Sequence, residues 1–281
     1  RFWNPFFAIS HGKIIRKVKK HIPGLKVVAI CDNIIPHERS MLDKILINYL
    51  FKVIDGFIVM SPQVESELKN LVEDPCHELV FHPVTSKQIE LTKSSARSNL
   101  NIKHKKIIMF FGFVREYKGL DVLIKANQYL KDRLDDYCII VCGECYGDEK
   151  QYRDLIEKFS YNNEIYWIND YISEELAANY FMASDVTVLP YKSASQSGVI
   201  PLSYAYDSPV IASSIPGIQE MVDDGETGFL FEKNNASQLA DKIIEFYDSD
   251  ADYRKNIIEY RKKFEWSNFI EKLFNLSKKI S

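Results

Sequence analysis

The segment Phe110-Phe-Gly-Phe-Val-Arg-Glu-Tyr-Lys-Gly119 joins an apolar run to a loop that carries two basic side chains. Residues 106–112 have the length and composition of a buried strand, and residues 119–130 show helical spacing. In sheets of parallel strands, ligands bind where the strands end. Arg115 can grip a diphosphate as a bidentate fork and Lys118 as a point charge. We therefore predict an anion site here; the alternative is two exposed basic residues on a loop.

Apolar runs of strand length alternate with helical patterns on both sides of this segment. Further strands are expected at residues 26–31, 56–60, 137–143, 164–168, 185–189, 209–213 and 228–231. Such alternation predicts βαβ units and parallel sheets, and hence an α/β fold. Six strands fall within residues 106–250, enough for a complete Rossmann-like sheet. The first block has two clear strands and a third candidate at Glu78–Phe81, which is few for a sheet of this class.

The polar stretch Thr85–Lys105 separates the two blocks and predicts a domain boundary. We expect a partial Rossmann-like domain over residues 1–100 and a complete one over residues 101–250. Residues 251–281 are expected to form C-terminal helices that pack back on the first domain. Because the chain begins with Arg1 and the first block has few strands, we expect the N-terminal domain to be incomplete.

Composition predicts a globular protein, with 46% hydrophobic and 27% charged residues and a net charge of −3. No run of 18 apolar residues indicates a transmembrane helix. The five cysteines do not suggest a disulfide framework. Cys142 and Cys145 form a C-x-x-C pattern, but no second cysteine or histidine pair completes a zinc site, so we expect no metal.

Lysine and arginine gather between Lys13 and Lys26, on a segment whose isoleucines and valine fall roughly on one side of a helix. One interpretation is a basic amphipathic helix on an anionic membrane surface. The other, which we favour at this level, is a solvated helix whose apolar stripe faces the core. We expect a cytoplasmic protein, peripheral at the inner face of the membrane if the first interpretation holds, and no nucleic-acid partner.

A second candidate region follows the strand expected at residues 185–189. A polar loop, Tyr191–Gln196, leads to a helix that begins near Ser197-Gly198-Val199. Free backbone N–H groups at the start of a helix bind phosphate well. On spacing alone, an ordinary strand–helix turn explains this loop equally well.

Six motifs in this order resemble the C-terminal domain of glycosyltransferase family 4, which has the GT-B fold. They are Gly112…Lys118-Gly119, Ala183-Ser-Asp185…Leu189-Pro190, Ser197-Gly198…Pro201-Leu202, Pro209-Val-Ile-Ala212, Gly217…Glu220 and Asp224-Gly-x-x-Gly228. Residues 26–84 resemble the later part of the family's N-terminal domain. The resemblance implies two Rossmann-like domains, of which the first is the acceptor side and the second binds the nucleotide sugar.

The resemblance also implies an activity, namely retaining transfer of a sugar from a nucleotide diphosphate sugar without a metal ion or other cofactor. Lys118 and Arg115 would face the diphosphate as catalytic groups, near Gly112. The backbone of Ser197, Gly198 and Val199 would bind the distal phosphate. The loop with Tyr171 and Ile172 would lie near the base. The acceptor would be a glycan or a lipid-linked molecule of cell-surface polysaccharide or glycolipid assembly.

Three positions depart from the family pattern. Phe113 stands where the family usually has arginine directly after the glycine, and Arg115 is the nearest substitute. Gln196 and Tyr204 stand where the family often has two glutamates. Gln196 can still hydrogen-bond a sugar hydroxyl, whereas Tyr204 has two alternatives: a contact with a ribose hydroxyl, or packing.

The family's usual histidine after an N-terminal strand is also missing. Asp32 or His37 could take its place near the transferred sugar, but a turn cap and a loop histidine are equally good explanations. Two other functions stay open: a catalytically impaired binding protein, and a sugar-nucleotide epimerase. We expect this chain by itself to bind a diphosphate more readily than it catalyses transfer.

Overall fold

The computed structural model describes residues 6–34, 41–84 and 91–281, which form two compact units. The first unit comprises residues up to Pro83 together with Lys263–Ser281, and the second comprises Val84–Lys262. The structure thus ends the first unit at Pro83, whereas the sequence placed the boundary at residue 100. The helix over residues 93–99 belongs to the second unit because Arg97 donates two hydrogen bonds to the Asp185 carboxylate, at 3.0 and 3.1 Å.

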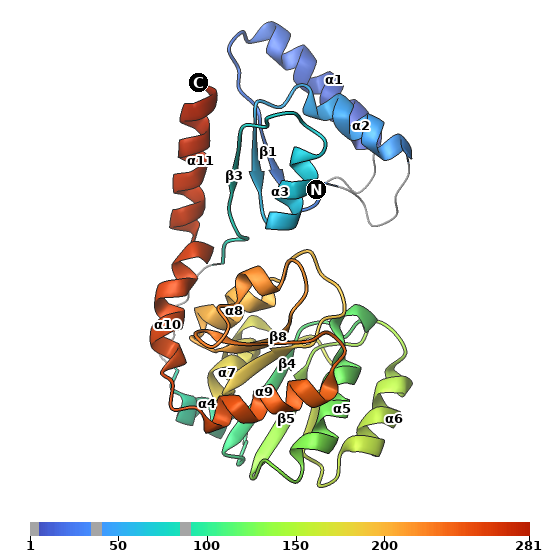
Figure 1. Ribbon diagram of the computed structural model, residues 1–281, viewed down its shortest axis with the longest axis vertical. Helices are drawn as coiled ribbons and strands as arrows, with labels where there is room; N and C mark the ends of the chain where they lie inside the picture. Colours follow the sequence, from blue (N-terminus) through green and yellow to red (C-terminus); the bar gives the residue numbers. More distant parts are fainter. Residues whose placement is uncertain (1–5, 35–40, 85–90) are drawn as a thin grey trace. The chain divides into compact units, whose positions relative to one another are not determined.

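The first unit contains a three-stranded parallel sheet in the order β1-β2-β3. Its elements are α1 (Phe6–His21), β1 (Val28–Cys31), α2 (Met41–Phe51), β2 (Gly56–Val59), α3 (Pro62–Lys69), β3 (His77–Leu79) and α11 (Trp266–Ile280). Helices α1 and α2 pack on each other, and α11 runs alongside β2 and β3 (Figure 1). The third candidate strand is therefore present. Of the tail expected to pack on the first domain, α11 does so, whereas residues 251–262 belong to the second unit.

The second unit contains a six-stranded parallel sheet in the order β6-β5-β4-β7-β8-β9, the strand order of a Rossmann fold. The strands are β4 (Lys106–Phe111), β5 (Tyr137–Cys142), β6 (Ile165–Ile168), β7 (Val186–Leu189), β8 (Val210–Ser213) and β9 (Gly228–Phe231). Every strand predicted here is present. The predicted α/β class with Rossmann-like parallel sheets is confirmed.

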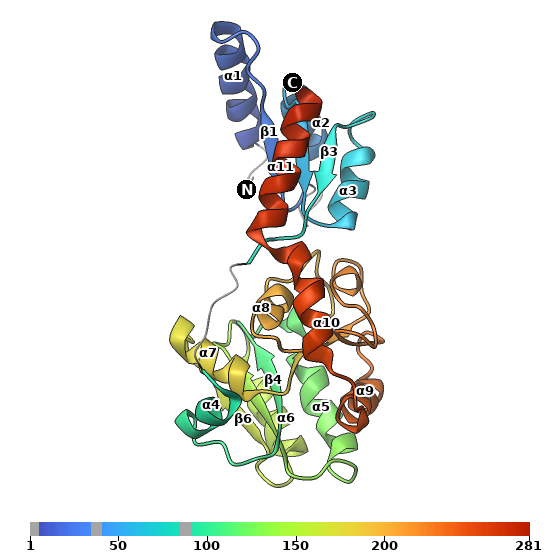
Figure 2. The same ribbon diagram turned by 90° about the vertical axis from the view of Figure 1, so that its left-hand side faces the viewer.

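Helices cover both faces of this sheet. They are α4 (Lys93–Asn99), α5 (Leu120–Leu130), α6 (Glu149–Phe159), α7 (Glu174–Ala183), α8 (Val199–Ala205), α9 (Ala236–Asp248) and α10 (Tyr253–Tyr260). Short 3₁₀ turns are η1 (Glu116–Lys118), η2 (Gln219–Met221) and η3 (Arg261–Phe264). Helix α5 packs against α6 and α9, whereas α4 packs against α7, and Figure 2 shows these two groups on opposite sides of β4.

Local sequence sets the starts of helices α3 and α7. Ser61 accepts a hydrogen bond from the Val64 N–H at 3.2 Å, with Pro62 in the first turn of α3. Ser173 does the same for the Leu176 N–H at 3.3 Å at the start of α7. Among the described residues, no helix is long and apolar enough to cross a membrane.

Candidate functional site

The candidate site lies in the second unit, where β4 and β7 end side by side. The strand order reverses between these two strands, because the chain runs outward from β4 to β6 and then returns to β7. Such a reversal leaves a crevice at the carboxyl ends of the strands in open α/β sheets. The loop 112–119 follows β4, and the loop 190–198 follows β7. The two regions singled out in the sequence are thus neighbours in the fold.

Lys118 is the central side chain of this site. Its Nζ atom lies 2.7 Å from the position that a Cβ atom would take on Gly112, and the Val199 Cγ2 atom is 3.9 Å from the same position. Gly112 has φ +99°, so both its conformation and its missing side chain admit the ammonium group. The structure therefore brings together Gly112, Lys118 and Val199, as the sequence predicted.

The environment of Lys118 favours an anionic ligand. The side chain is 9% exposed, and within the described part of the chain no carboxylate pairs with it. Burial disfavours the charged ammonium and lowers the pKa of Lys118 to about 8, and the nearby Arg115 guanidinium adds to this effect. Because an uncompensated buried cation is costly, a bound anion would restore the balance of charge.

The loop 190–198 is held in place from the side of α5. The Lys192 N–H donates to the Tyr117 carbonyl at 2.7 Å, and its ammonium lies 2.8 Å from the Asp121 carboxylate. Gly119, at φ +69°, packs so tightly that a Cβ atom would lie 1.9 Å from the Pro190 carbonyl oxygen. The loop 190–198 is therefore fixed by contacts with η1 and α5.

Ser197, Gly198 and Val199 open α8. The Ser197 hydroxyl is buried and accepts a hydrogen bond from the Val199 N–H at 3.1 Å. That amide is consequently taken, so of the three predicted phosphate-binding amides those of Ser197 and Gly198 are available within the described structure. Gly198 is exposed, with open space around its Cα atom.

Gln196 carries a buried carbonyl oxygen, Oε1, that has no hydrogen-bond partner among the described residues. A buried acceptor without a donor costs free energy, about 1–3 kcal/mol. A hydroxyl group of a bound sugar would satisfy it. The structure thus places Gln196 within the loop 190–198 with an unused acceptor.

Arg115 is exposed and precedes η1. Its guanidinium carbon lies 5.2 Å from the centre of the Tyr146 ring, and its carbonyl accepts a hydrogen bond from the Lys118 N–H at 2.9 Å. Arg115 and Lys118 therefore lie on one short turn, and their positive charges are close enough to repel each other.

Tyr171 and Ile172, predicted near the base, lie in the loop after β6. Tyr171 is 70% exposed, so its ring is available to a ligand. Ile172 instead packs against the core cluster that contains Phe181 and Tyr180. Only the backbone of Ile172 could then serve a ligand in this conformation.

Tyr204 is fully buried, and its hydroxyl lies 2.9 Å from the Thr227 hydroxyl and 3.2 Å from the Met221 carbonyl. Its ring meets Tyr260 edge to face. Of the two alternatives for this residue, the structure supports packing, because neither the ring nor the hydroxyl is open to a ribose. The sequence does not predict this burial, because a position on α8 can face either the core or a ligand.

The two candidates from the N-terminal domain belong to the first unit. Asp32 is half-buried at the carboxyl end of β1, next to Cys31, whose pKa is raised to about 12 mainly by burial. His37 lies outside the described residues. The predicted contacts of Asp32 and His37 with the transferred sugar therefore stay predictions.

Sequence reasoning missed two aromatic residues at the site. Tyr191 is buried with its ring centre 5.7 Å from the Lys118 Nζ atom, and burial raises the pKa of its hydroxyl. Tyr146 follows β5 and faces Arg115. Tyr191 directly follows the Leu189-Pro190 motif, so its place at the site could have been predicted from the sequence. The place of Tyr146 could not, because only the fold brings the loop after β5 to Arg115.

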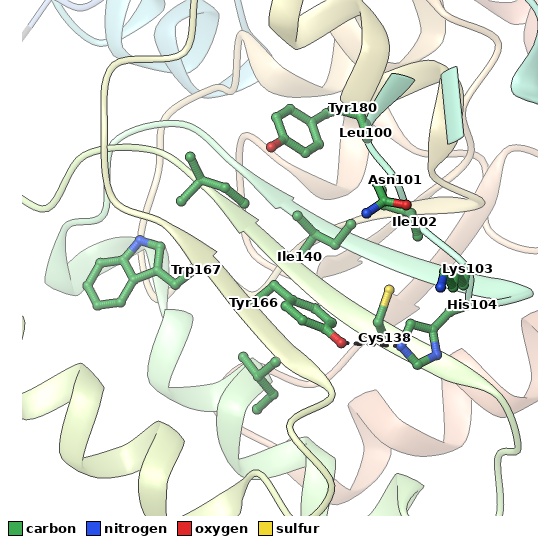
Figure 3. A pocket seen from close by; sticks show the side chains of 12 residues that line it. Leu100, Asn101, Ile102, Lys103, His104, Cys138, Ile140, Tyr166, Trp167 and Tyr180 are labelled. Carbon is green, nitrogen blue, oxygen red and sulfur yellow. Dashed lines mark hydrogen bonds between the residues drawn. The ribbon is translucent and has the colours of Figure 1, made fainter. Parts of the chain in front are cut away.

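A separate cavity of about 610 Å³ lies against β5 and β6 (Figure 3). It is lined by Leu100, Asn101, Ile102, Lys103, His104, Cys138, Ile140, Ile165, Tyr166, Trp167, Ile168 and Tyr180. Figure 3 shows the Tyr166 hydroxyl directed at His104, whose Nε2 atom is 3.4 Å away. None of the predicted site residues lines this cavity. We therefore place the candidate site at the strand ends.

Cysteine provides no further site. Cys138 and Cys142 are buried, and burial raises the pKa of the Cys138 thiol to about 12. Within the described ranges, no group of three or more His, Cys, Asp and Glu side chains is arranged to hold a metal ion.

Comparison with known proteins decides the family. The model of the family "Glycosyl transferases group 1" matches residues 92–264, which is more than half of the chain. This protein belongs to the group 1 glycosyltransferases. The predicted resemblance is thereby confirmed, and the matched region includes the whole candidate site.

Relatives of this glycosyltransferase are distant. D-inositol 3-phosphate glycosyltransferase from Corynebacterium aurimucosum is 26% identical over 79% of this chain. The matched region is 51% of the length of that relative, so this chain spans about half of it. An uncharacterized glycosyltransferase from Methanocaldococcus jannaschii is 26% identical over 94% of this chain and 71% of its own length.

Solved structures confirm the GT-B fold. HepE from Anabaena in complex with UDP superposes with a TM-score of 0.80 at 16% identity, covering 95% of this chain and 77% of its own. Sucrose-phosphate synthase from Thermosynechococcus elongatus gives 0.76 at 20% identity, covering 96% and 71%. At these identities the likeness concerns the fold alone.

Proposed function

We propose that this group 1 glycosyltransferase transfers a sugar from a nucleotide diphosphate sugar to an acceptor hydroxyl. The observation that carries the proposal is Lys118, a buried ammonium that has no carboxylate partner among the residues the structure describes and lies at the reversal point of a Rossmann-like sheet. A diphosphate supplies the missing negative charge. As the sugar–oxygen bond breaks, the charge on the leaving diphosphate rises, so Lys118 stabilises the transition state more than the ground state.

Arg115 and the amides of Ser197 and Gly198 complete the proposed diphosphate site. Arg115 offers a bidentate contact, and the two amides point dipoles at the distal phosphate without side-chain reorganisation. In the proposed mechanism these groups take the role that a divalent cation has in other transferases, and the sugar is transferred with retention of configuration. Gln196 receives a hydrogen bond from a hydroxyl of the transferred sugar.

The acceptor proposed for this enzyme is a glycan or lipid-linked molecule of cell-surface polysaccharide or glycolipid assembly, reached at the cytoplasmic face of the membrane. Helix α1 supports the location. Ile15 packs on the core of the first unit, but Ile14, Val18 and Ile22 are 59%, 36% and 54% exposed. The stripe expected to face the core is thus largely open, with Lys13 and Lys17 beside it. This arrangement fits an anionic lipid surface.

Isothermal titration with UDP, GDP and other nucleoside diphosphates, and with their sugars, tests the donor proposal. We expect at least one diphosphate to bind, and Lys118→Ala to weaken it at least tenfold. Lys150→Ala, which removes an exposed lysine of α6, should leave the affinity unchanged. Absence of binding by every nucleotide would refute the proposal; equal binding by the Lys118 variant would refute the site.

A second function, binding without catalysis, is favoured by one observation. The two positions where family members often have glutamates hold a neutral Gln196 and a buried Tyr204. Incubation with donor sugar and a panel of lipid-linked acceptors distinguishes the two. Transfer of labelled sugar supports catalysis, whereas tight diphosphate binding with no product from any acceptor supports a binding protein.

A further inference from the structure

Three consecutive loops at the carboxyl edge of the six-stranded sheet are tied together. The Val114 N–H donates to the Glu144 carbonyl at 2.8 Å, and the Tyr146 N–H donates to the Val114 carbonyl at 2.9 Å. The Cys145 N–H donates to the Asn169 side chain at 2.8 Å, which adds the loop after β6. The loop after β5 is therefore fixed relative to the loop 112–119 by backbone hydrogen bonds rather than by side-chain packing alone.

This tie places an aromatic pair directly beside Arg115. The rings of Phe113 and Tyr146 meet edge to face, with centres 4.9 Å apart, and the Arg115 guanidinium carbon lies 5.2 Å from the Tyr146 ring centre. Both rings are solvent-exposed, at 44% and 50%. The face of the Tyr146 ring is therefore available to the Arg115 guanidinium rather than covered by the core.

Arg115 needs such a neighbour. An arginine side chain carries about 2 kcal/mol of rotamer entropy, which is lost when its guanidinium is fixed on a ligand. Within the described structure no carboxylate pairs with Arg115, so no ion pair orients it. The Lys118 ammonium repels it: the pKa of Lys118 is lowered mainly by burial and further by the Arg115 charge. The attractive contact that the described structure gives this guanidinium is the ring of Tyr146.

We propose that Tyr146 is a positioning residue, whose ring, braced by Phe113, holds the Arg115 guanidinium so that Arg115 and Lys118 meet the same diphosphate. The attraction is that of a cation for the face of an aromatic ring. Phe113 thereby has a function at the position where the family usually has arginine: it supports the ring that orients the displaced arginine. This inference rests on the proposed function, because it concerns the diphosphate that Arg115 binds.

The Tyr146 hydroxyl is separable from its ring. The charge of the Glu144 carboxylate raises the pKa of the Tyr146 hydroxyl, whereas the Arg115 guanidinium lies over the ring. Tyr146→Phe keeps the face of the ring and removes the hydroxyl. Tyr146→Leu keeps apolar volume against Phe113 and removes the π face. Comparison of these two variants isolates the cation–ring contact.

Titration of the intact chain with the nucleoside diphosphate that binds it, and with the matching monophosphate, tests the proposal. Tyr146→Leu should weaken diphosphate binding about two- to fivefold and change monophosphate binding less. Tyr146→Phe should restore the wild-type affinity. Tyr129→Leu, which removes a comparably exposed tyrosine of α5, should have no effect.

A double-mutant cycle gives the decisive outcome. In an Arg115→Ala background, Tyr146→Leu should cause no further loss, because its effect runs through Arg115. If Tyr146→Leu lowers the diphosphate affinity equally in both backgrounds, the proposal is overturned. It is also overturned if Arg115→Ala binds the diphosphate more weakly while Tyr146→Leu binds it like the wild type. If Arg115→Ala binds diphosphate like the wild type, this inference fails while the Lys118 site stands. If no nucleotide binds, both the inference and the proposed function fail.

Discussion

The Lys118 Nζ atom occupies the space beside Gly112 that a side chain would otherwise fill, 2.7 Å from an ideal Cβ position. The same burial that fits Lys118 into this space disfavours its charge and lowers its pKa from 10.5 to about 8. The site therefore stores an unfavourable interaction that a bound anion relieves. A substitution that removes the charge of Lys118 should consequently raise the stability of the fold and lower the affinity for an anion.

Replacement of Lys118 by methionine should stabilise the second unit while it weakens diphosphate binding. A pKa lowered by about 2.5 units corresponds to a charge penalty of up to about 3 kcal/mol near neutral pH, and methionine keeps the aliphatic packing. We expect a gain of about 1–2 kcal/mol in urea unfolding. Lys150→Met is the matched control, with an exposed side chain and no expected change. Destabilisation by Lys118→Met would contradict a burial penalty.

Affinity for a nucleoside diphosphate should fall as pH rises above about 8. Unliganded Lys118 loses its proton through its lowered pKa, so above pH 8 the ligand must first restore the charge. Titrations at pH 7, 8 and 9 measure the effect. The Lys118→Met variant should lose most of this pH dependence; an equal dependence in both proteins would assign it to another group.

Folding stability should respond to pH in the opposite direction. Between about pH 8 and 10.5 the unfolded chain binds the Lys118 proton and the folded chain does not, so this group makes stability rise with pH. Other titrating groups cancel in the difference between wild type and Lys118→Met. The stability advantage of the variant should therefore shrink between pH 8 and 10, and an advantage that stays constant would argue against the shifted lysine.

Particular residues show how far sequence reasoning reaches. The strands of the second unit were predictable because apolar runs such as Ile107–Phe110 are nearly continuous, as expected for strands buried on both faces. The proximity of Lys118 to Gly112 was predictable because both residues lie near the end of one strand. The partnership of Arg115 with Tyr146 did not, since it depends on strand order, which places β5 next to β4. The burial of Tyr204 and Ile172 was not predictable either, because it depends on packing against residues that are far away in the sequence.

The boundary of the second unit depends on Asp185, which accepts hydrogen bonds from Arg97, the Ile107 N–H and Tyr247. Asp185→Asn removes the charge that pairs with a part-buried Arg97 and should destabilise the second unit by about 3 kcal/mol. Trp167 is the tryptophan of this unit. Its fluorescence reports the unfolding in a Trp3→Phe, Trp266→Phe background. Asp241→Asn, which breaks an exposed pair with Arg133, should cost less than about 1 kcal/mol.

Helix α1 should bind anionic lipid vesicles through its open stripe. The intact chain should co-sediment with phosphatidylglycerol vesicles more than with phosphatidylcholine vesicles, and salt should weaken the binding because the lysine contribution is screened. Ile14→Ser with Val18→Ser should reduce binding strongly, since both side chains are exposed on the described helix. Ile258→Ser, at an exposed apolar position on α10, is the control. Binding that is independent of lipid charge and of these residues would exclude the proposed surface.

Tyr204→Phe distinguishes a core residue from a ligand contact. The hydroxyl of Tyr204 hydrogen-bonds Thr227 inside the second unit, and its removal leaves that partner without a full set of bonds. We expect a loss of about 1 kcal/mol in unfolding free energy, measured through Trp167 in the background described above. Affinity for a nucleoside diphosphate should be unchanged, because the buried hydroxyl cannot reach a ribose in this fold. If the affinity falls severalfold while stability is kept, Tyr204 contacts the ribose and α8 must move when the donor binds.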